Sequence, residues 1–327
     1  MRKVQGSKVA VVGGAGFLGS HLVDWLIGTY ECEVLVVDNL ITGRREFINK
    51  LAKFEYADIT KSESYLRRLF QKYEIEYVFN YAAEPYIPVS FERPQHVWSV
   101  NATGAFMVIN AAVDAGVKAI LQISSAEIYG EGRRQDDEFK TTGTLDENDP
   151  VVPHSTYGAS KAAIDALIQV RWREARTPCI ALRQFNCVGE RETHPYVIPE
   201  IISQLSRGPT VRLGNNSSRD FLYAGDQACM AIELMEAGSF GEVYNLGSEK
   251  AIKIYELAEL IGELMLHRKI EIQVDEKRKR PWEIWHLQSD NTKIYKTIFS
   301  KPRVSLEDAL RRTIIDYHSN GGRWCWE

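Results

Sequence analysis

The sequence is poor in cysteine and has no cysteine pattern of the kind that binds a metal. Five cysteines are spread over 327 residues, and no two of them form a C-x-x-C pair: Cys32, Cys179, Cys187, Cys229 and Cys325. An odd number at wide spacing favours neither a zinc site nor a disulfide framework. We therefore expect no bound metal, and reduced, mostly buried thiols of the kind found in cytoplasmic proteins.

An excess of positive charge and a long apolar run are also missing. The 40 basic and 44 acidic residues give a net charge of −4, and the basic run 277–280 is too short to indicate DNA binding. No run of 18 apolar residues occurs, and the first apolar stretch leads into glycines rather than a signal-peptide cleavage site. These absences argue against a nucleic acid or a membrane as the partner and favour a small molecule.

The first half of the chain alternates short apolar runs with helical patterns. This alternation predicts βαβ units and a Rossmann-type, doubly wound parallel sheet covered on both faces by helices. The expected strands are 8–12, 33–38, 77–80, 119–124 and 179–183, and the expected helices are 17–27, 62–72, 94–115 and 157–174.

The pattern becomes less regular after about residue 184. Short apolar runs at 210–213 and 242–245 are mixed with helical patterns, the last of them at 305–317. We expect a dinucleotide-binding domain over 1–183, to which about 215–250 returns, and a smaller α/β domain over 184–327 that covers the substrate.

Three glycines between the first strand and the first helix indicate a dinucleotide site. Gly13, Gly16 and Gly19 form G-x-x-G-x-x-G, which allows a tight turn, a close approach to a pyrophosphate and close helix–strand packing. Asp38 ends the next strand, where a carboxylate accepts hydrogen bonds from ribose hydroxyls and repels a 2′-phosphate. The combination predicts binding of NAD rather than NADP.

A second group of residues carries functional groups for acid–base chemistry. Tyr157 and Lys161 are four apart on an expected helix and so share one face, where the ammonium would favour the phenolate. Ser125 and Glu127 follow the strand that ends near Ser124. Ligands in parallel α/β sheets bind at the carboxyl ends of strands, so these four side chains are the candidate catalytic residues.

The order and spacing of many short segments carry a family resemblance over nearly the whole chain. The sequence resembles the extended short-chain dehydrogenase/reductase family, the NAD-dependent epimerases and dehydratases of nucleotide sugars. The matching segments are GGAGFLG, VVDNL, ADIT, NYAAE, SVNATGA, SSAEIYG, YGASK, LRQFNCVG, SSRDFLYAGD, EVYNLGS, RPWEIWHLQSDNTKI and VSLEDALRRTI.

The resemblance implies an NAD-binding Rossmann domain, a smaller nucleotide-sugar domain and a homodimer. It places the nucleotide-sugar substrate against Ser125, Asn186, Arg219 and Arg280, with the two arginines at the diphosphate. The cofactor contacts that it implies are Gly13, Gly16, Phe17, Leu18, Gly19, Asp38, Asn39, Asp58, Ile59, Ala82, Ala83, Asn101, Tyr157 and Lys161.

The same resemblance implies the roles of the catalytic residues. Tyr157 would remove the proton of the sugar 4-hydroxyl as hydride leaves C4. Ser125 would form a hydrogen bond with the same oxygen, and Lys161 would hold the nicotinamide ribose. Glu127 resembles the base that takes the C5 proton in 4,6-dehydratases, which is our first expectation. Ala126 departs from that pattern, because relatives often carry an Asp or Ser there that helps the C6 hydroxyl to leave.

Other outcomes stay open on the sequence. The runner-up is a nucleotide-sugar 4-epimerase of the UDP-glucose type, followed by a UDP-glucuronate decarboxylase-like or a 5,6-dehydratase reaction. A protein that binds the dinucleotide only as a sensor is a further alternative, against which the complete Ser125, Tyr157 and Lys161 set argues.

Overall fold

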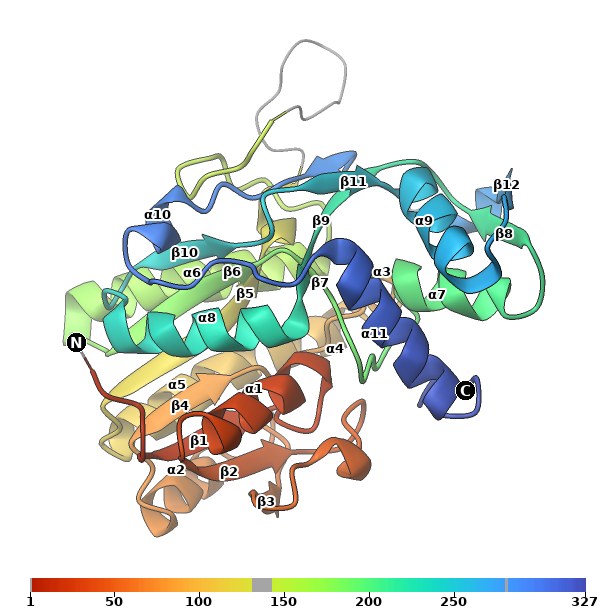
Figure 1. The fold of residues 1–327 in the computed structure, drawn as a ribbon. Coiled ribbons are helices and arrows are strands. Elements are labelled where there is room, and N and C mark those ends of the chain that lie inside the picture. The colour runs from red at the N-terminus through yellow and green to blue at the C-terminus, as the bar shows by residue number, and fades with distance from the viewer. Residues whose placement is uncertain (1, 131–142, 280–281) are drawn as a thin grey trace.

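The structure, a computed structural model, describes residues 2–130, 143–279 and 282–327. Its centre is a parallel sheet of seven strands in the order β10-β6-β5-β4-β1-β2-β3 (Figure 1). This order reverses between β1 and β4, which confirms the predicted doubly wound Rossmann-type fold. The strands are β1 (Lys8–Val12), β2 (Glu33–Asp38), β3 (Lys53–Tyr56), β4 (Tyr77–Asn80), β5 (Ala119–Ser125), β6 (Cys179–Gln184) and β10 (Val243–Leu246).

Helices cover both faces of this sheet, which explains why its strands are apolar almost throughout. On β1, Val9 and Val11 belong to the core on one face, and Ala10 and Val12 belong to the core on the other. The first core is closed by α1 (Phe17–Gly28) and α8 (Ala224–Ala237), and the second by α2 (Glu63–Lys72), α5 (Ala105–Asp114) and α6 (Thr156–Ala175).

The helix expected over 94–115 is interrupted. It consists of α4 (Pro94–Trp98), a π-helical turn at Ser99–Gly104 and α5, and it is preceded by a short helix α3 (Ile87–Glu92) that the sequence pattern did not indicate. The wider turn places Asn101, which is fully buried, beside the loop that follows β4. Insertions of this kind inside helices often occur at functional sites.

A smaller region packs above the carboxyl ends of the large sheet. Its third core, which includes Val188, Leu205 and Trp324, lies between short strands and three helices. The elements are β7 (Asn186–Val188), α7 (Val197–Leu205), β8 (Thr210–Leu213), β9 (Ser218–Tyr223), β11 (Ala251–Lys253), α9 (Ile254–Leu266), β12 (Glu271–Val274), β13 (His286–Leu287) and α11 (Leu306–Ser319). The helix α11 packs against α9, β7 and β9 (Figure 1).

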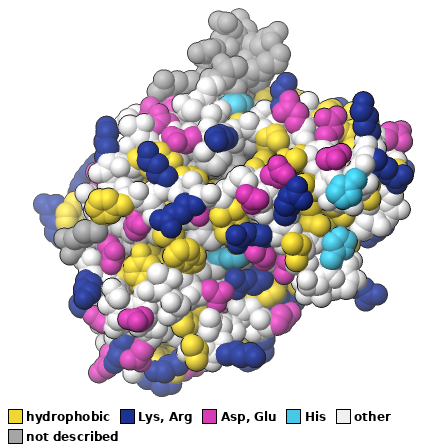
Figure 2. All heavy atoms as spheres, viewed as in Figure 1, with side chains coloured by type: hydrophobic (Ala, Val, Ile, Leu, Met, Phe, Trp, Pro, Cys, Tyr) yellow, Lys and Arg dark blue, Asp and Glu magenta, His cyan; other side chains and the backbone are white. Residues whose placement is uncertain are grey.

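The chain crosses between the two regions more than once. After β6 it enters the smaller region through β7, and it later returns to the large sheet with α8 and β10. The exact domain boundaries stay a prediction. Within the described ranges, no helix is both long and apolar enough to cross a membrane. Acidic and basic side chains are intermixed on the face that Figure 2 shows.

Gly19 sets how closely α1 approaches the loop after β1. A Cβ atom at this position would lie 2.1 Å from the carbonyl oxygen of Gly13, a contact that only movement of the backbone can relieve. Gly28, the last residue of the same helix, has no atom within 4 Å of an added Cβ. The two glycines therefore form a matched pair, one in contact with backbone and one in open space.

We expect Gly19→Ala to lower the free energy of unfolding by about 1–3 kcal/mol, because α1 must move away from the glycine loop. Gly28→Ala should leave stability unchanged or raise it by up to about 1 kcal/mol, because alanine has the higher helix propensity. Urea denaturation of both variants measures the difference. Equal midpoints for the two would show that the close contact does not limit the packing of α1.

Candidate active site

One large cavity lies along the carboxyl ends of the parallel strands and under the smaller region. Its volume is about 730 Å³, and its wall continues from the glycine loop to residues of β8 and β9. Most of the site residues predicted from the sequence line it: Gly13, Gly16, Phe17, Leu18, Gly19, Asp38, Asn39, Asp58, Ile59, Ala82, Ala83, Ser125, Glu127, Tyr157, Lys161, Asn186 and Arg219. Arg280 lies outside the described residues.

The start of α1 provides one end of the cavity with backbone donors. Gly16 is the N-cap residue, and within the described chain no side chain caps the first turn of this helix. The first-turn amides are therefore available to an anion at the positive end of the helix dipole. Gly13 has φ of +81°, and a Cβ there would lie 2.5 Å from the nitrogen of Ala82, so only glycine fits this turn. The cradle suits the pyrophosphate of a dinucleotide.

Asp38 stands at the end of β2 on the same wall. Its Oδ2 accepts from the amide of Ala15 at 3.0 Å, and its Oδ1 accepts from the amide of Leu40 at 2.8 Å. Burial raises the pKa of this carboxyl, and the backbone hydrogen bonds oppose the rise. A carboxylate held in this way keeps further acceptor positions for ribose hydroxyls. The residues present therefore fit NAD.

Asn101 is the one described residue of the predicted cofactor set that does not line the cavity. Its side-chain oxygen accepts from the amide of Glu84 at 2.8 Å, and its Nδ2 donates to the carbonyl of Glu84 at 3.0 Å. This pair of bonds fixes the segment directly after Ala82 and Ala83. Asn101 thus reaches the cavity only through the backbone that it orients.

Tyr157 and Lys161 lie together at the start of α6. The helix begins at the N-cap Ser155, whose hydroxyl accepts from the amide of Gly158 at 3.0 Å. A Cβ on Gly158 would lie 2.7 Å from the carbonyl of Glu127, so glycine lets α6 approach that loop closely. The Lys161 Nζ donates to the carbonyl of Ile123 at 3.0 Å and lies 5.9 Å from the ring centroid of Tyr157.

Burial shifts both of these groups toward their neutral forms. It raises the pKa of Tyr157 to about 12, against the opposing effect of a hydrogen bond with Ser125. It lowers the pKa of Lys161 to about 8. The expected lowering of the phenol pKa is therefore not present in this structure. The hydrogen bond with Ser125 favours the phenolate, whereas the charges of Glu127 and Glu84 add to the rise of the Tyr157 pKa.

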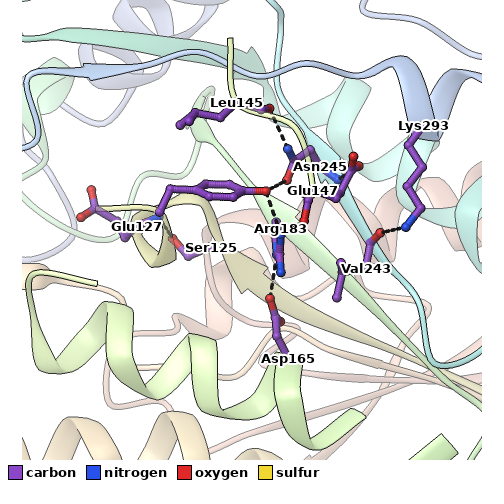
Figure 3. Close-up of polar contacts among 10 residues, drawn as sticks. Ser125, Glu127, Leu145, Glu147, Asp165, Arg183, Val243, Asn245 and Lys293 are labelled. Carbon is purple, nitrogen blue, oxygen red and sulfur yellow. Dashed lines mark hydrogen bonds and ion pairs between the residues drawn. The ribbon is translucent and has the colours of Figure 1, made fainter. Parts of the chain in front are cut away.

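Glu127 lies in a short helical turn, Ala126–Ile128, directly after β5. The Ser125 hydroxyl caps this turn and accepts from the amide of Glu127 at 3.2 Å. Two residues on, the hydroxyl of Tyr129 donates to Asn245 at 2.7 Å and accepts from Arg183 at 2.8 Å. In Figure 3 the Glu127 side chain extends away from this buried network. The hydrogen bonds of Tyr129 thus fix one side of this turn, and the carboxylate of Glu127 lies on the other side.

The far end of the cavity is more polar than the sequence indicated. Arg219 is buried and donates to Glu283 at 2.6 Å and to the carbonyl of Ile284 at 2.7 Å, so its guanidinium already has a carboxylate partner. Lys277 belongs to the basic run that is too short to indicate DNA binding, and it lies on the cavity wall, as do Arg278 and Lys279. These cations come from a loop of the smaller region, and only folding brings them to the site.

Sequence reasoning missed a second wall, formed by the loop between β7 and α7. Glu192, Thr193 and Tyr196 line the cavity from this loop. Next to them, His194 is buried and stacks on Tyr86 at 5.8 Å, outside the lining residues. Burial lowers the pKa of His194 to about 4, so the ring is neutral. No residue spacing in the sequence singled out Glu192.

Comparison with known proteins identifies relatives of two kinds. A sequence model of the NAD dependent epimerase/dehydratase family matches residues 9–247. The chain is 30% identical to the dTDP-D-glucose 4,6-dehydratase of Mus musculus, over 97% of this chain and 90% of that protein. It is 28% identical to the UDP-glucose 4-epimerase of Lacticaseibacillus casei, over 95% and 97% of the two chains.

Similar solved structures also include 4-epimerases and 4,6-dehydratases. The UDP-glucose 4-epimerase of Thermotoga maritima, solved with UDP-glucose, superposes with a TM-score of 0.86 at 28% identity, over 96% of this chain and 99% of that one. A dTDP-glucose 4,6-dehydratase of Streptomyces venezuelae, solved with NAD bound, gives 0.85 at 26% identity, over 97% and 99%.

The low pKa of Lys161 predicts how stability changes with pH. Between about pH 8 and 10.5 the unfolded chain holds a proton on this lysine that the folded protein has lost, so stability rises with pH across that window. Lys161→Met removes this contribution. Between about pH 8 and 10.5, we expect the free energy of unfolding of the wild type to rise by on the order of 3 kcal/mol more than that of the variant.

Urea denaturation of both proteins at a series of pH values measures this gain, and the two curves should run parallel below about pH 8. Curves that stay parallel up to pH 10.5 would show that Lys161 has an ordinary pKa in the folded protein.

Proposed function

The chain belongs to the NAD-dependent epimerase/dehydratase family, and we propose that it is a nucleotide-sugar 4,6-dehydratase. In this proposal the enzyme oxidises the sugar at C4, removes water across C5 and C6, and releases a 4-keto-6-deoxy sugar. The observation that carries the proposal is that the carboxylate of Glu127 shares one cavity wall with Ser125, Tyr157 and Lys161. A redox centre with a base beside it fits elimination better than simple inversion at C4.

The first step uses the residues of α6 and β5. Tyr157 takes the proton from the sugar 4-hydroxyl, Ser125 hydrogen-bonds the same oxygen, and Lys161 stabilises the phenolate and holds the nicotinamide ribose. NAD, held by the glycine loop and Asp38, would supply reversible hydride transfer and would not be consumed. Burial of Tyr157 keeps water away from the reacting oxygen.

The second step uses Glu127. A ketone at C4 acidifies the proton on C5, and the carboxylate of Glu127, which extends away from the buried network around Arg183, would remove it. Loss of the C6 hydroxyl then forms the C5–C6 double bond, and Glu127 returns its proton to C5 when C6 is reduced. The sequence of events needs a base that can alternate between its two protonation states.

The far end of the cavity would hold the nucleotide. We infer that Asn186 and Arg219 contact the nucleoside diphosphate, together with Lys277 and Lys279. The pairing of Arg219 with Glu283 orients its guanidinium and leaves the exposed lysines to meet the phosphate charge. Several cations around one diphosphate are the arrangement that phosphate recognition requires.

A 4-epimerase is the second candidate. It is supported by relatives of that kind at 28% identity and by Ala126, which cannot assist a leaving hydroxyl. In that reaction Tyr157 and NAD would suffice, and Glu127 would have no proton to take. The fate of the C5 proton therefore separates the two candidates.

We also propose that the enzyme works in the cytoplasm as a homodimer. All five cysteines are free thiols, in agreement with a reducing compartment. Three large apolar side chains are partly exposed on neighbouring helices, Phe91 on α3, Trp98 on α4 and Val170 on α6. Apolar side chains on adjacent helices are the kind of surface that a second copy of the chain would cover.

The deciding experiment is a panel of UDP-, dTDP-, GDP- and CDP-sugars, with products followed by NMR in deuterated water. A dehydratase gives deuterium at C5 and loss of the 6-hydroxyl, without added NAD, because the bound cofactor is regenerated. Inversion at C4 without exchange at C5 would replace this function by that of an epimerase. A strict requirement for a second redox substrate would exclude both.

Tyr157→Phe separates an enzyme from a protein that only senses the dinucleotide. We expect turnover to fall by about 10²–10⁴-fold, because the proton acceptor at O4 is lost, while bound NAD is retained. Nucleotide released on denaturation and the melting temperature serve as controls for cofactor binding and folding. Unchanged turnover in this variant would show that the phenol is not the acid–base group.

A further inference from the structure

The proposed dehydration needs a general acid in addition to Ser125, Glu127, Tyr157 and Lys161. Water leaves C6 readily only if an acid protonates the departing hydroxyl, and Ala126, the neighbour of Glu127, has no acidic proton. Ser125 and Tyr157 are already assigned to O4, and Glu127 acts as the base. If the protein has the proposed dehydratase function, on which this inference rests, another group in the cavity must be the acid.

Most other carboxyl groups on the cavity wall already have partners or lie outside its interior. Glu200 pairs with Arg278 at 2.8 Å, and Glu283 pairs with Arg219 at 2.6 Å. Asp38 and Asp58 accept hydrogen bonds at the cofactor end, and Glu92 is exposed on α3. None of these can deliver a proton to the sugar without first losing its present contacts or leaving the surface.

Glu192 differs from all of them. It lines the cavity and is 2% exposed, and its Oε2 is buried without a hydrogen-bond partner among the described residues. Burial, and after it the charge of Asp316, raises the pKa of this carboxyl well above the ordinary value. Burial thus favours the neutral, proton-bearing form of this carboxyl, and its Oε2 has no competing hydrogen bond to a described residue.

The backbone around Glu192 is held in an unusual conformation. Arg191 has φ of +65°, a left-handed conformation that is uncommon outside glycine. Its amide donates to Asp316 at 3.0 Å, and its guanidinium pairs with Asp24 at 2.8 Å. The Sγ of Cys325 donates to the carbonyl of Glu192 at 3.4 Å. Contacts from α1, α11 and the end of the chain thus maintain a local strain at this position.

The same loop connects Glu192 with the redox centre. Tyr196, four residues on, lies on the cavity wall, and burial raises its pKa well above the ordinary value. The charges of Tyr157 and Glu192 both act on its phenol in the same direction. Tyr157, Glu192 and Tyr196 all line one cavity, so the loop of Glu192 and the redox centre border the same space.

We propose that Glu192 is the catalytic acid that protonates the leaving C6 hydroxyl. Glu127 takes the proton from C5, the electron pair of that C–H bond forms the C5–C6 double bond, and the C6–O bond breaks. The O–H bond of Glu192 breaks at the same time, so the hydroxyl leaves as water. Glu192 is left as a carboxylate, and the proton that Tyr157 took from O4 restores it. Both side chains then have their starting protonation states.

The test uses a leaving group that needs no acid. Wild type and Glu192→Gln are compared on dTDP-glucose, or on the glucose nucleotide that the panel selects, and on its 6-deoxy-6-fluoro analogue, because fluoride departs without a proton. We expect the variant to dehydrate the 6-hydroxy sugar at least about 100-fold more slowly and to release fluoride at close to the wild-type rate. Exchange of the C5 proton should persist, because Glu127 is intact.

The matched control is Glu190→Gln on the same loop. Glu190 accepts a hydrogen bond from Tyr223 at 3.1 Å and does not line the cavity, so the same substitution there should leave both rates unchanged. Undiminished dehydration by Glu192→Gln would overturn the proposal. So would an equal loss on both substrates, which would indicate a structural role. If wild type forms no 6-deoxy product from any nucleotide sugar, the dehydratase function itself fails, and this role fails with it.

Discussion

The buried ion pair between Arg183 and Asp165 joins the parts of the molecule on which the site depends. The two side chains are 4% and 3% exposed, and Nε lies 2.8 Å from Oδ2. Arg183 also donates to the hydroxyl of Tyr129, so β6, α6 and the loop after β5 meet at one guanidinium. Removal of one partner of such a pair leaves an uncompensated buried charge and costs about 3–5 kcal/mol. The pair therefore fixes the loop of Ser125 and Glu127 against the helix of Tyr157 and Lys161.

Around this anchor the cavity has two unlike walls. The sheet side supplies backbone donors at the glycine loop, where a side chain on Gly13 or Gly19 would collide with backbone, and the fixed candidates Glu127, Tyr157 and Lys161. The side formed by the smaller region supplies ionisable groups, of which Glu192 is buried and unpartnered among the described residues and Lys277 is a surface cation. A rigid cofactor cradle facing a charged and acidic cover suits a substrate with a diphosphate at one end and a reacting sugar at the other.

Much of the fold was accessible from periodicity, because each buried strand is a continuous apolar run and each covering helix has its own repeat. Periodicity did not predict the structure of the segment 94–115 correctly. Its pattern is helical throughout, yet a π-helical turn at Ser99–Gly104 brings Asn101 to Glu84, and α3 had no pattern of its own. Such local departures depend on what a residue meets in the fold, and the residue's neighbours in the chain do not determine them.

By itself the sequence determined the parallel sheet, the glycine loop, Asp38 and the candidate set of Ser125, Glu127, Tyr157 and Lys161, because each lies at a fixed offset from a strand end or on one helix face. Only the tertiary structure decided the electrostatics. In the folded chain, burial raises the pKa of Tyr157, Arg219 is paired with Glu283, and Glu192 lines the cavity with an Oε2 that has no hydrogen-bond partner among the described residues. These properties arise from desolvation and from contacts between segments far apart in the chain, and no spacing along the sequence encodes them.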